Sequence, residues 1–363
     1  MRGETGMRSL RRFGPVVFAL LLSMPFFDKI AIAQPREEAV ELNNQAVVYI
    51  GSHRDTEAID LLQRAIVLEP GLAIAHFNLG CVYDTQGRFD EAANQFNQAL
   101  KLDPNFAAAH RCLGVVFNQA GRYEEAVESF KTALRIKSAD AETLTELAFA
   151  YSQLGMHQQA RECAEAAVRS NPHLTNAYNN LGVACYELGQ TDRAITAFQS
   201  ALGINPNVAE VYNNLAHVYA ETGRSSEAID YYRHAIQRKP DYYLALTNLG
   251  ITYLASDRYS EAIESFKQAS HLRPDDANIY YALGYSFAKS GKKKEAINAY
   301  TRAIELNPDF GEARNNLAVL YLERGERGLA LDQYSRLKTI SPELAAKLFA
   351  EIYRDKILQA SGR

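Results

Sequence analysis

Hydrophobic and polar positions alternate in a pattern of 34 residues that recurs along most of the chain. In residues 73–106, Leu79 and Tyr83 lie four apart, as residues on one face of a helix do. Gly87 interrupts that helix, and apolar residues then return at helical spacing at Ala92, Phe96 and Ala99. Pro104 closes the unit, since proline cannot continue a helix. Each unit therefore predicts two amphipathic helices joined by a tight turn.

Prolines set the period of this pattern. Eight of the 11 prolines recur at intervals of 34 residues, or of 68 where Ser138 stands in place of one: Pro70, Pro104, Pro172, Pro206, Pro240, Pro274, Pro308 and Pro342. The same register divides residues 39–344 without insertion into nine units: 39–72, 73–106, 107–140, 141–174, 175–208, 209–242, 243–276, 277–310 and 311–344. A single hairpin cannot bury its apolar face alone, so the pattern predicts an all-α array of stacked hairpins.

Small and aromatic residues recur at fixed places within the units. A Leu-Gly or Leu-Ala pair marks the first helix, and an Ala-Phe/Tyr-Ala trio marks the second, as in Ala194, Phe198 and Ala201. This pattern resembles the tetratricopeptide repeat family. The resemblance implies a right-handed superhelical solenoid of nine helix-turn-helix repeats, whose first helices line an inner wall that binds extended peptides. Residues 345–363 are expected to form a capping helix and tail, with Leu348 and Ile352 on its apolar face.

The N-terminal segment predicts export. Arg8, Arg11 and Arg12 precede an apolar run, and Ala31-Ile32-Ala33 resembles a cleavage site, so residues 1–33 are interpreted as a signal peptide cut after Ala33. Residues 34–38 are expected to be a linker. The mature protein would be periplasmic or secreted, and it would contact a membrane only if the segment were retained as an anchor.

Charge argues against one class of partner. Five of the 39 Lys and Arg and two of the 43 Asp and Glu lie in residues 1–33, which leaves 34 basic against 41 acidic residues. A nucleic-acid binder needs a concentrated basic surface, so no nucleic-acid partner is expected.

Catalytic chemistry has no sequence signal here. The chain lacks the nucleotide-binding and zinc motifs that place glycines, lysine or histidines at fixed spacing, so no enzyme activity, metal, cofactor or small-molecule substrate is predicted. Of the four cysteines, Cys81 with Cys112 and Cys163 with Cys185 lie on neighbouring helices. Each pair is interpreted either as a disulfide of an exported protein or as buried free thiols.

Candidate binding residues come from the helical wheel of the first helix. With each unit numbered from place 1, places 4, 7, 8 and 11 face the core, and places 2, 5, 9, 12 and 13 lie opposite, with place 6 at the border. The candidates on that wall are Asn44, Asn78, Asn179, Asn180, Asn213, Asn214, Asn248, Asn316, Arg111, Tyr186, His217, Tyr281 and Tyr285. The expected best segment is 175–276, because place 6 lacks asparagine at Cys112, Glu146 and Ala282.

The asparagine column is open to two interpretations. It resembles the asparagine ladder in the repeat domain of O-linked N-acetylglucosamine transferase, which holds polypeptide with little sequence selectivity. An amide both donates and accepts, so the column suits either an extended peptide or hydrogen bonds to the neighbouring repeat. The sequence therefore predicts a non-enzymatic interaction scaffold that binds an extended segment of a protein partner. The alternative is an accessory subunit of envelope polysaccharide synthesis or export, or of a glycosyltransferase complex.

Overall fold

The structure is a computed structural model, and it describes residues 35–353. Every regular element within that range is a helix, and there are 19 of them. The first and second helices of the nine hairpins are α1 (Pro35–Gly51) and α2 (Asp55–Leu68), α3 (Ala73–Thr85) and α4 (Phe89–Leu102), α5 (Ala107–Gln119) and α6 (Tyr123–Ile136), α7 (Ala141–Gln153) and α8 (His157–Ser170), α9 (Thr175–Glu187) and α10 (Thr191–Ile204), α11 (Ala209–Glu221) and α12 (Ser225–Arg238), α13 (Tyr243–Ala255) and α14 (Tyr259–Leu272), α15 (Ala277–Lys289) and α16 (Lys293–Leu306), α17 (Gly311–Glu323) and α18 (Arg327–Ile340). A last helix, α19 (Pro342–Ile352), follows them.

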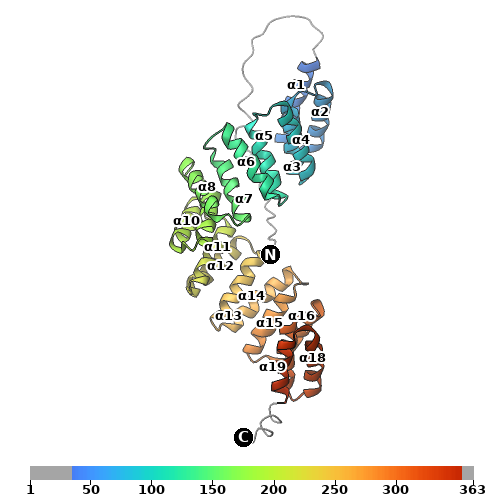
Figure 1. The fold of residues 1–363 in the computed structure, drawn as a ribbon, viewed down its shortest axis with the longest axis vertical. Coiled ribbons are helices and arrows are strands. Elements are labelled where there is room, and N and C mark those ends of the chain that lie inside the picture. The colour runs from blue at the N-terminus through green and yellow to red at the C-terminus, as the bar shows by residue number, and fades with distance from the viewer. Residues whose placement is uncertain (1–34, 354–363) are drawn as a thin grey trace, which may run out of the picture.

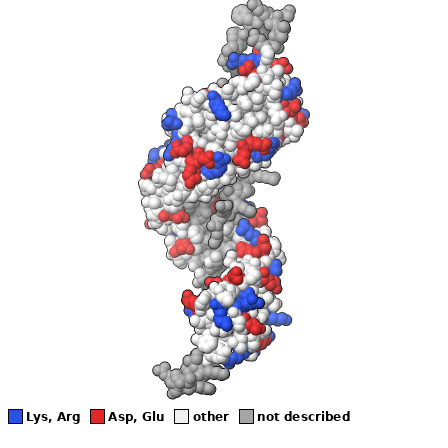
Figure 2. Space-filling view, turned by 45° about the vertical axis from the view of Figure 1, so that its right-hand side comes forward, with Lys and Arg blue, Asp and Glu red and all other residues white. Residues whose placement is uncertain are grey.

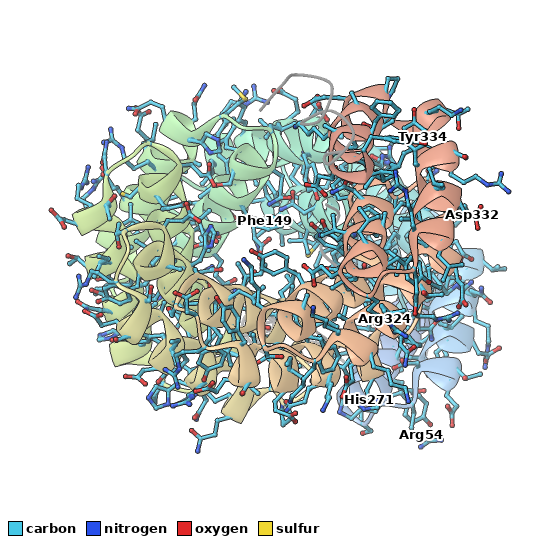
Figure 3. The ribbon with its side chains drawn as sticks, turned by 90° about the horizontal axis from the view of Figure 1, so that it is seen from below. Arg54, Phe149, His271, Arg324, Asp332 and Tyr334 are labelled. Atoms are coloured by element: carbon cyan, nitrogen blue, oxygen red, sulfur yellow. The ribbon has the colours of Figure 1, made fainter. Side chains whose placement is uncertain are left out.

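The hairpins stack in chain order into an elongated superhelix (Figure 1). Seen along its long axis, the helices form a ring around an open centre (Figure 3). Phe149 on the first helix α7 points into that centre, whereas Asp332 on the second helix α18 lies at the outer edge. First helices therefore line the inside of the superhelix, and second helices cover its outside. None of the helices in residues 35–353 is both long enough and apolar enough to cross a membrane.

The turn inside each hairpin requires a left-handed backbone at place 15. Glycine fills that place in seven repeats, with φ between 72° and 78°, for example 73° at Gly87 and 72° at Gly189. His53 and Asp257 take the same conformation in the remaining two, with φ of 55° and 56°. Glycine is favoured because a Cβ clashes in this region of the backbone map.

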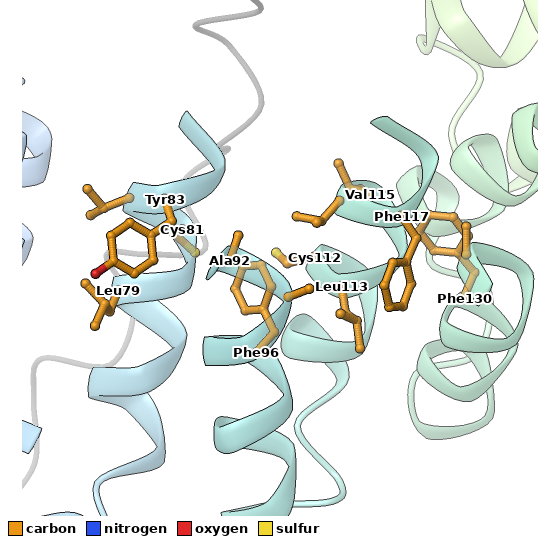
Figure 4. Packing of buried hydrophobic residues seen from close by; sticks show 14 of the residues in the cluster. Leu79, Cys81, Tyr83, Ala92, Phe96, Cys112, Leu113, Val115, Phe117 and Phe130 are labelled. Carbon is orange, nitrogen blue, oxygen red and sulfur yellow. The ribbon is translucent and has the colours of Figure 1, made fainter. Parts of the chain in front are cut away.

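In five of the nine hairpins, a glycine on the first helix lies against an aromatic ring on the second. In the fifth repeat, a Cβ added to Gly182 would lie 2.6 Å from Cε1 of Phe198, whose side chain is 1% exposed. Phe96 and Phe130 take the corresponding place in α4 and α6 and are fully buried, as Figure 4 shows for the core between α3 and α6. Glycine thus allows close approach of the two helices, and burial of the ring offsets its low helix propensity.

The predicted fold class is confirmed: the described chain is an all-helical solenoid of nine hairpins followed by a capping helix. The cap starts earlier than expected, because the Ser341 side chain accepts a hydrogen bond from the Leu344 amide (3.4 Å) and Pro342 suits the first helical turn. Leu348 and Ile352 of this helix are buried against α17 and α18, as predicted.

The predicted linker, residues 34–38, is wrong over its described part, which is helical. Residues 35–38 form the first turn of α1, because Pro35 is compatible with a helix start and the Glu37 and Glu38 carboxylates favour the positive end of the helix dipole. The predicted signal peptide, residues 1–33, and the tail at 354–363 lie outside the described residues. All four cysteines are free thiols; Cys81, Cys112 and Cys185 are buried, and Cys163 is half-buried.

Candidate functional site

The candidate site is the inner wall, defined here as places 2, 5, 6, 9, 12 and 13 of the first helices. Residues at these places recur on one side of each helix, and the stacking of the hairpins brings that side of successive helices to the same open centre (Figure 3). Several apolar side chains stay exposed there: Ile251 at 53%, Leu244 at 45% and Tyr285 at 37%. Large exposed apolar side chains gathered on a concave surface indicate an interaction site.

Asparagines at place 6 tie five first helices, α3, α9, α11, α13 and α17, to the repeat before them. The amide nitrogen of each donates to the residue 35 positions earlier, at place 5 of the preceding repeat: Asn78 to Asn43 Oδ1 (2.8 Å), Asn180 to the Thr145 carbonyl (3.0 Å), Asn214 to Asn179 Oδ1 (3.0 Å) and Asn248 to Asn213 Oδ1 (3.4 Å). Asn316 follows the same rule with the Tyr281 hydroxyl (3.4 Å) and also donates to Tyr300 (3.3 Å). The column is therefore part of the contact between repeats.

The amides differ in what they leave for a ligand. Asn78 and Asn213 are each only 7% exposed, so they mainly serve the array itself. Asn44, Asn179 and Asn180 are half-buried, as are Asn214, Asn248 and Asn316. A primary amide has two N–H donors and two lone pairs, and a single bond to the previous repeat leaves the others available. Both interpretations of the column are thus compatible with one geometry.

Two predicted residues from different repeats meet on the wall. The Tyr186 hydroxyl on α9 and Nε2 of His217 on α11 are 3.3 Å apart, and the rings meet edge to face with centroids 5.5 Å apart. Burial raises the pKa of Tyr186, and the negative charges of Glu221 and Glu187 raise it further. The four side chains therefore form one group at the centre of the array.

The aromatic residues of the eighth repeat have different surroundings. Tyr281 packs against Phe310 with ring centroids 5.0 Å apart, and burial raises its pKa. It is thus largely a packing residue of the hairpin. Tyr285 is more open, and the Lys289 ammonium lies 5.4 Å from its ring centroid.

Acidic residues dominate the charge of the wall. Among the described residues at its places, Arg111 and Lys289 stand against eight acids: Asp84, Glu142, Glu146, Glu187, Glu210, Glu221, Glu312 and Glu323. Arg111 forms an ion pair with Glu142 (3.2 Å), which reduces its capacity to hold an acidic ligand. Elsewhere the signs mix: in the view of Figure 2, acidic and basic side chains are interspersed over the surface.

Sequence reasoning missed several apolar residues of the wall. Phe149, Leu244 and Ile251 occupy places 9, 2 and 9, so the same helical wheel could have found them. They were not predicted because the candidates were chosen for hydrogen-bonding and charged groups. Phe149 packs on Tyr123 with centroids 6.3 Å apart and extends into the open centre (Figure 3).

Other kinds of site find less support in the described residues. No group of three or more His, Cys, Asp or Glu in residues 35–353 is arranged to hold a metal ion. Two open depressions, of about 530 and 610 Å³, lie between second helices, one between α12 and α14 and the other between α4 and α6. They are separate from the inner wall.

Comparison with known proteins gives one consistent family. Family models described as tetratricopeptide repeat match residues 37–105, 77–141, 140–206, 175–241 and 281–345, and one described as TPR repeat matches 252–291. No curated protein sequence matches the chain.

Solved structures agree at the level of fold. A tetratricopeptide repeat protein from Parabacteroides merdae is 18% identical, covers 69% of this chain and 99% of its own, and has a TM-score of 0.57. The C-terminal part of a TPR repeat-containing protein from Cytophaga hutchinsonii is 20% identical, covers 65% of this chain and 97% of its own, and has a TM-score of 0.55. The APC/C hetero-tetramer Cut9-Hcn1 matches at 15% identity over 86% of this chain and 76% of its own, with a score of 0.52.

Proposed function

Because this chain belongs to the tetratricopeptide repeat family, whose members generally serve as protein-interaction scaffolds, we propose that it binds an extended segment of another protein along its inner wall, without catalysing a reaction. The observation that carries this proposal is the strip of exposed apolar side chains on that wall. Leu244 and Ile251 on α13 and Tyr285 on α15 are exposed on adjacent repeats. Burying them under a partner would release water from apolar surface, which favours binding.

The asparagine column adds the polar part of the proposal. Half-buried amides at Asn180, Asn214 and Asn248 lie one repeat apart, and each keeps hydrogen-bonding capacity beyond its bond to the preceding repeat. An extended peptide presents N–H and C=O groups along its length, which such amides can satisfy. Apolar contacts would supply affinity and the amides would supply orientation.

Photocrosslinking tests this function. A benzoylphenylalanine at position 251 or 285 in the native cell should capture a protein partner, and the same group at Val67 should not. Val67 is a suitable control because it is 78% exposed but lies on the second helix α2, away from the wall. Equal capture at 67 and 251, or no protein captured from the wall, would contradict the proposal.

Export is a second part of the proposal and is tested separately. We infer from the sequence that residues 1–33 direct the chain out of the cytoplasm and are then removed. Mass spectrometry of the protein purified from its native cell should give Gln34 as the first residue, and fractionation should place the protein in the periplasm or the medium. An intact N-terminus in the cytoplasmic fraction would refute it.

A further inference from the structure

The described inner wall carries a group of side chains suited to a positively charged side chain of the partner. We infer that the segment bound in the groove carries arginine, and that this arginine docks on Tyr186, Glu187, His217 and Glu221, here called the central ledge. This inference rests on the proposed function, because it specifies the chemistry of the same ligand. It concerns the fifth and sixth repeats, residues 175–242.

The ledge combines two chemical features in a small space. Its aromatic floor is the Tyr186–His217 pair, with the hydroxyl 3.3 Å from Nε2 and the ring centroids 5.5 Å apart. Its acidic side comes from Glu221, one helical turn after His217 on α11, and from Glu187, next to Tyr186 on α9. Burial raises the pKa of the Tyr186 hydroxyl, and the charges of both carboxylates raise it further.

The two carboxylates are available to a ligand. Glu187 and Glu221 are exposed, and neither forms an ion pair with a Lys or Arg of residues 35–353. Three of the other six wall acids form ion pairs: Glu142 with Arg111, Glu210 with Lys239 (3.7 Å) and Glu323 with Lys293 (2.8 Å). The ledge therefore offers negative charge that the protein itself does not neutralise.

The charge of the whole wall selects the same kind of partner. With eight acids against two basic residues, one of them paired, the wall repels an acidic segment and attracts a basic one. Arginine fits better than lysine because its planar guanidinium stacks on aromatic rings and forms forked hydrogen bonds to carboxylates. A neutral apolar segment would leave the two carboxylates of the ledge unpaired.

Selection from a phage-displayed library of random linear peptides tests the inference. Peptides selected by the full array should be enriched in arginine. A synthetic copy of a selected peptide should bind about tenfold more weakly when citrulline replaces its arginine, since citrulline keeps the shape and removes the charge. The array should be the mature chain with all nine repeats and the capping helix.

Matched variants locate the effect. The double variant Glu187→Gln/Glu221→Gln should lose about tenfold in affinity for the arginine peptide and none for the citrulline peptide. The control Glu124→Gln/Asp230→Asn changes the net charge equally on second helices α6 and α12 and should bind as the wild type does. Circular dichroism of both variants checks that the helices are retained.

The outcomes separate this inference from the function beneath it. Groove binding stands if peptides are selected and Ile251→Ser lowers their affinity. The arginine inference is nevertheless wrong if those peptides are not enriched in arginine, or if Glu187→Gln/Glu221→Gln leaves their affinity unchanged. If no peptide is selected, or Ile251→Ser changes the affinity of none of them, both are overturned.

Discussion

Replacing Gly182 by alanine tests whether close approach of the two helices holds each hairpin together. The new Cβ would lie 2.6 Å from Cε1, 2.7 Å from Cδ1 and 2.8 Å from Cζ of Phe198, and the ring is 1% exposed. Overpacking of this kind costs about 1–3 kcal/mol. Alanine returns about 1 kcal/mol because it is the better helix former. We therefore expect the free energy of unfolding to fall by up to about 2 kcal/mol.

A control in the same hairpin separates the two contributions. Gly203 on α10 has no atom within 4 Å of an added Cβ, so Gly203→Ala should keep the propensity gain and stabilise by up to about 1 kcal/mol. The first repeat suggests a rescue, because it places Ala46 where Gly182 stands and Leu62 where Phe198 stands. In Gly182→Ala/Phe198→Leu, the loss should be smaller than the sum of the two single losses by about 1 kcal/mol.

The assay must resolve single repeats, since repeat arrays unfold in parts. Urea unfolding followed by circular dichroism gives the overall change, and hydrogen exchange of the α9 and α10 amides gives the local one. Exchange should accelerate in this hairpin for Gly182→Ala and not for Gly203→Ala. The packing argument fails if Gly182→Ala and Gly203→Ala are equally stable. It also fails if the loss of stability in Gly182→Ala/Phe198→Leu equals the sum of the two single losses.

Three further predictions concern the turns, a helix cap and a thiol. Gly189→Ala should lower the melting temperature by an amount equivalent to about 1–2 kcal/mol, because φ is 72° there and alanine is strained in that conformation. No atom crowds an added Cβ at this position, so strain is the only cause. A melting temperature equal to that of the wild type would contradict this argument. Burial alone would raise the pKa of Asp140, but hydrogen bonds from Lys137 and Thr143 hold it below its usual value. A carboxyl whose pKa is lowered by folding stabilises the fold at pH values above its ordinary pKa of about 3.9. This stabilisation is lost as the pH falls through the lower pKa of the folded state. Asp140→Ala should therefore cost about 1 kcal/mol near neutral pH, and urea unfolding at about pH 3 should show a smaller difference from wild type. Burial raises the pKa of Cys163 to about 11, so the rate of its alkylation by iodoacetamide should rise severalfold between about pH 9 and 10. In the unfolded chain, where the thiol pKa is about 8.5, the rate should change little over the same range; peptide mass spectrometry measures both.

Much of the site could be predicted from the sequence because the two sides of each first helix follow from the spacing of residues within that helix. The wheel correctly identified core places, such as those of Leu215 and Tyr219. It could not tell which wall residues the array uses for itself. Asn78 and Asn213 are buried, and each is hydrogen-bonded to a residue 35 positions away in a neighbouring repeat. Which residues pair depends on how one hairpin rotates against the next.

The central ledge also depends on how neighbouring hairpins rotate against each other. Tyr186 and His217 are 31 residues apart, at places 12 and 9 of successive repeats, and nothing in either helix alone brings them together. The superhelical offset between α9 and α11 brings the two rings together.

By itself, the sequence determined the number of hairpins, their helices and the contact between a small and a large residue inside most of them, because these depend on spacings within 34 residues. The tertiary structure alone decided which amides join neighbouring repeats, which carboxylates stay unpaired and which rings from different repeats share a surface. The physical reason is that these contacts depend on the small rotation between stacked hairpins, which arises from packing across whole helix faces and has no local signature in the chain.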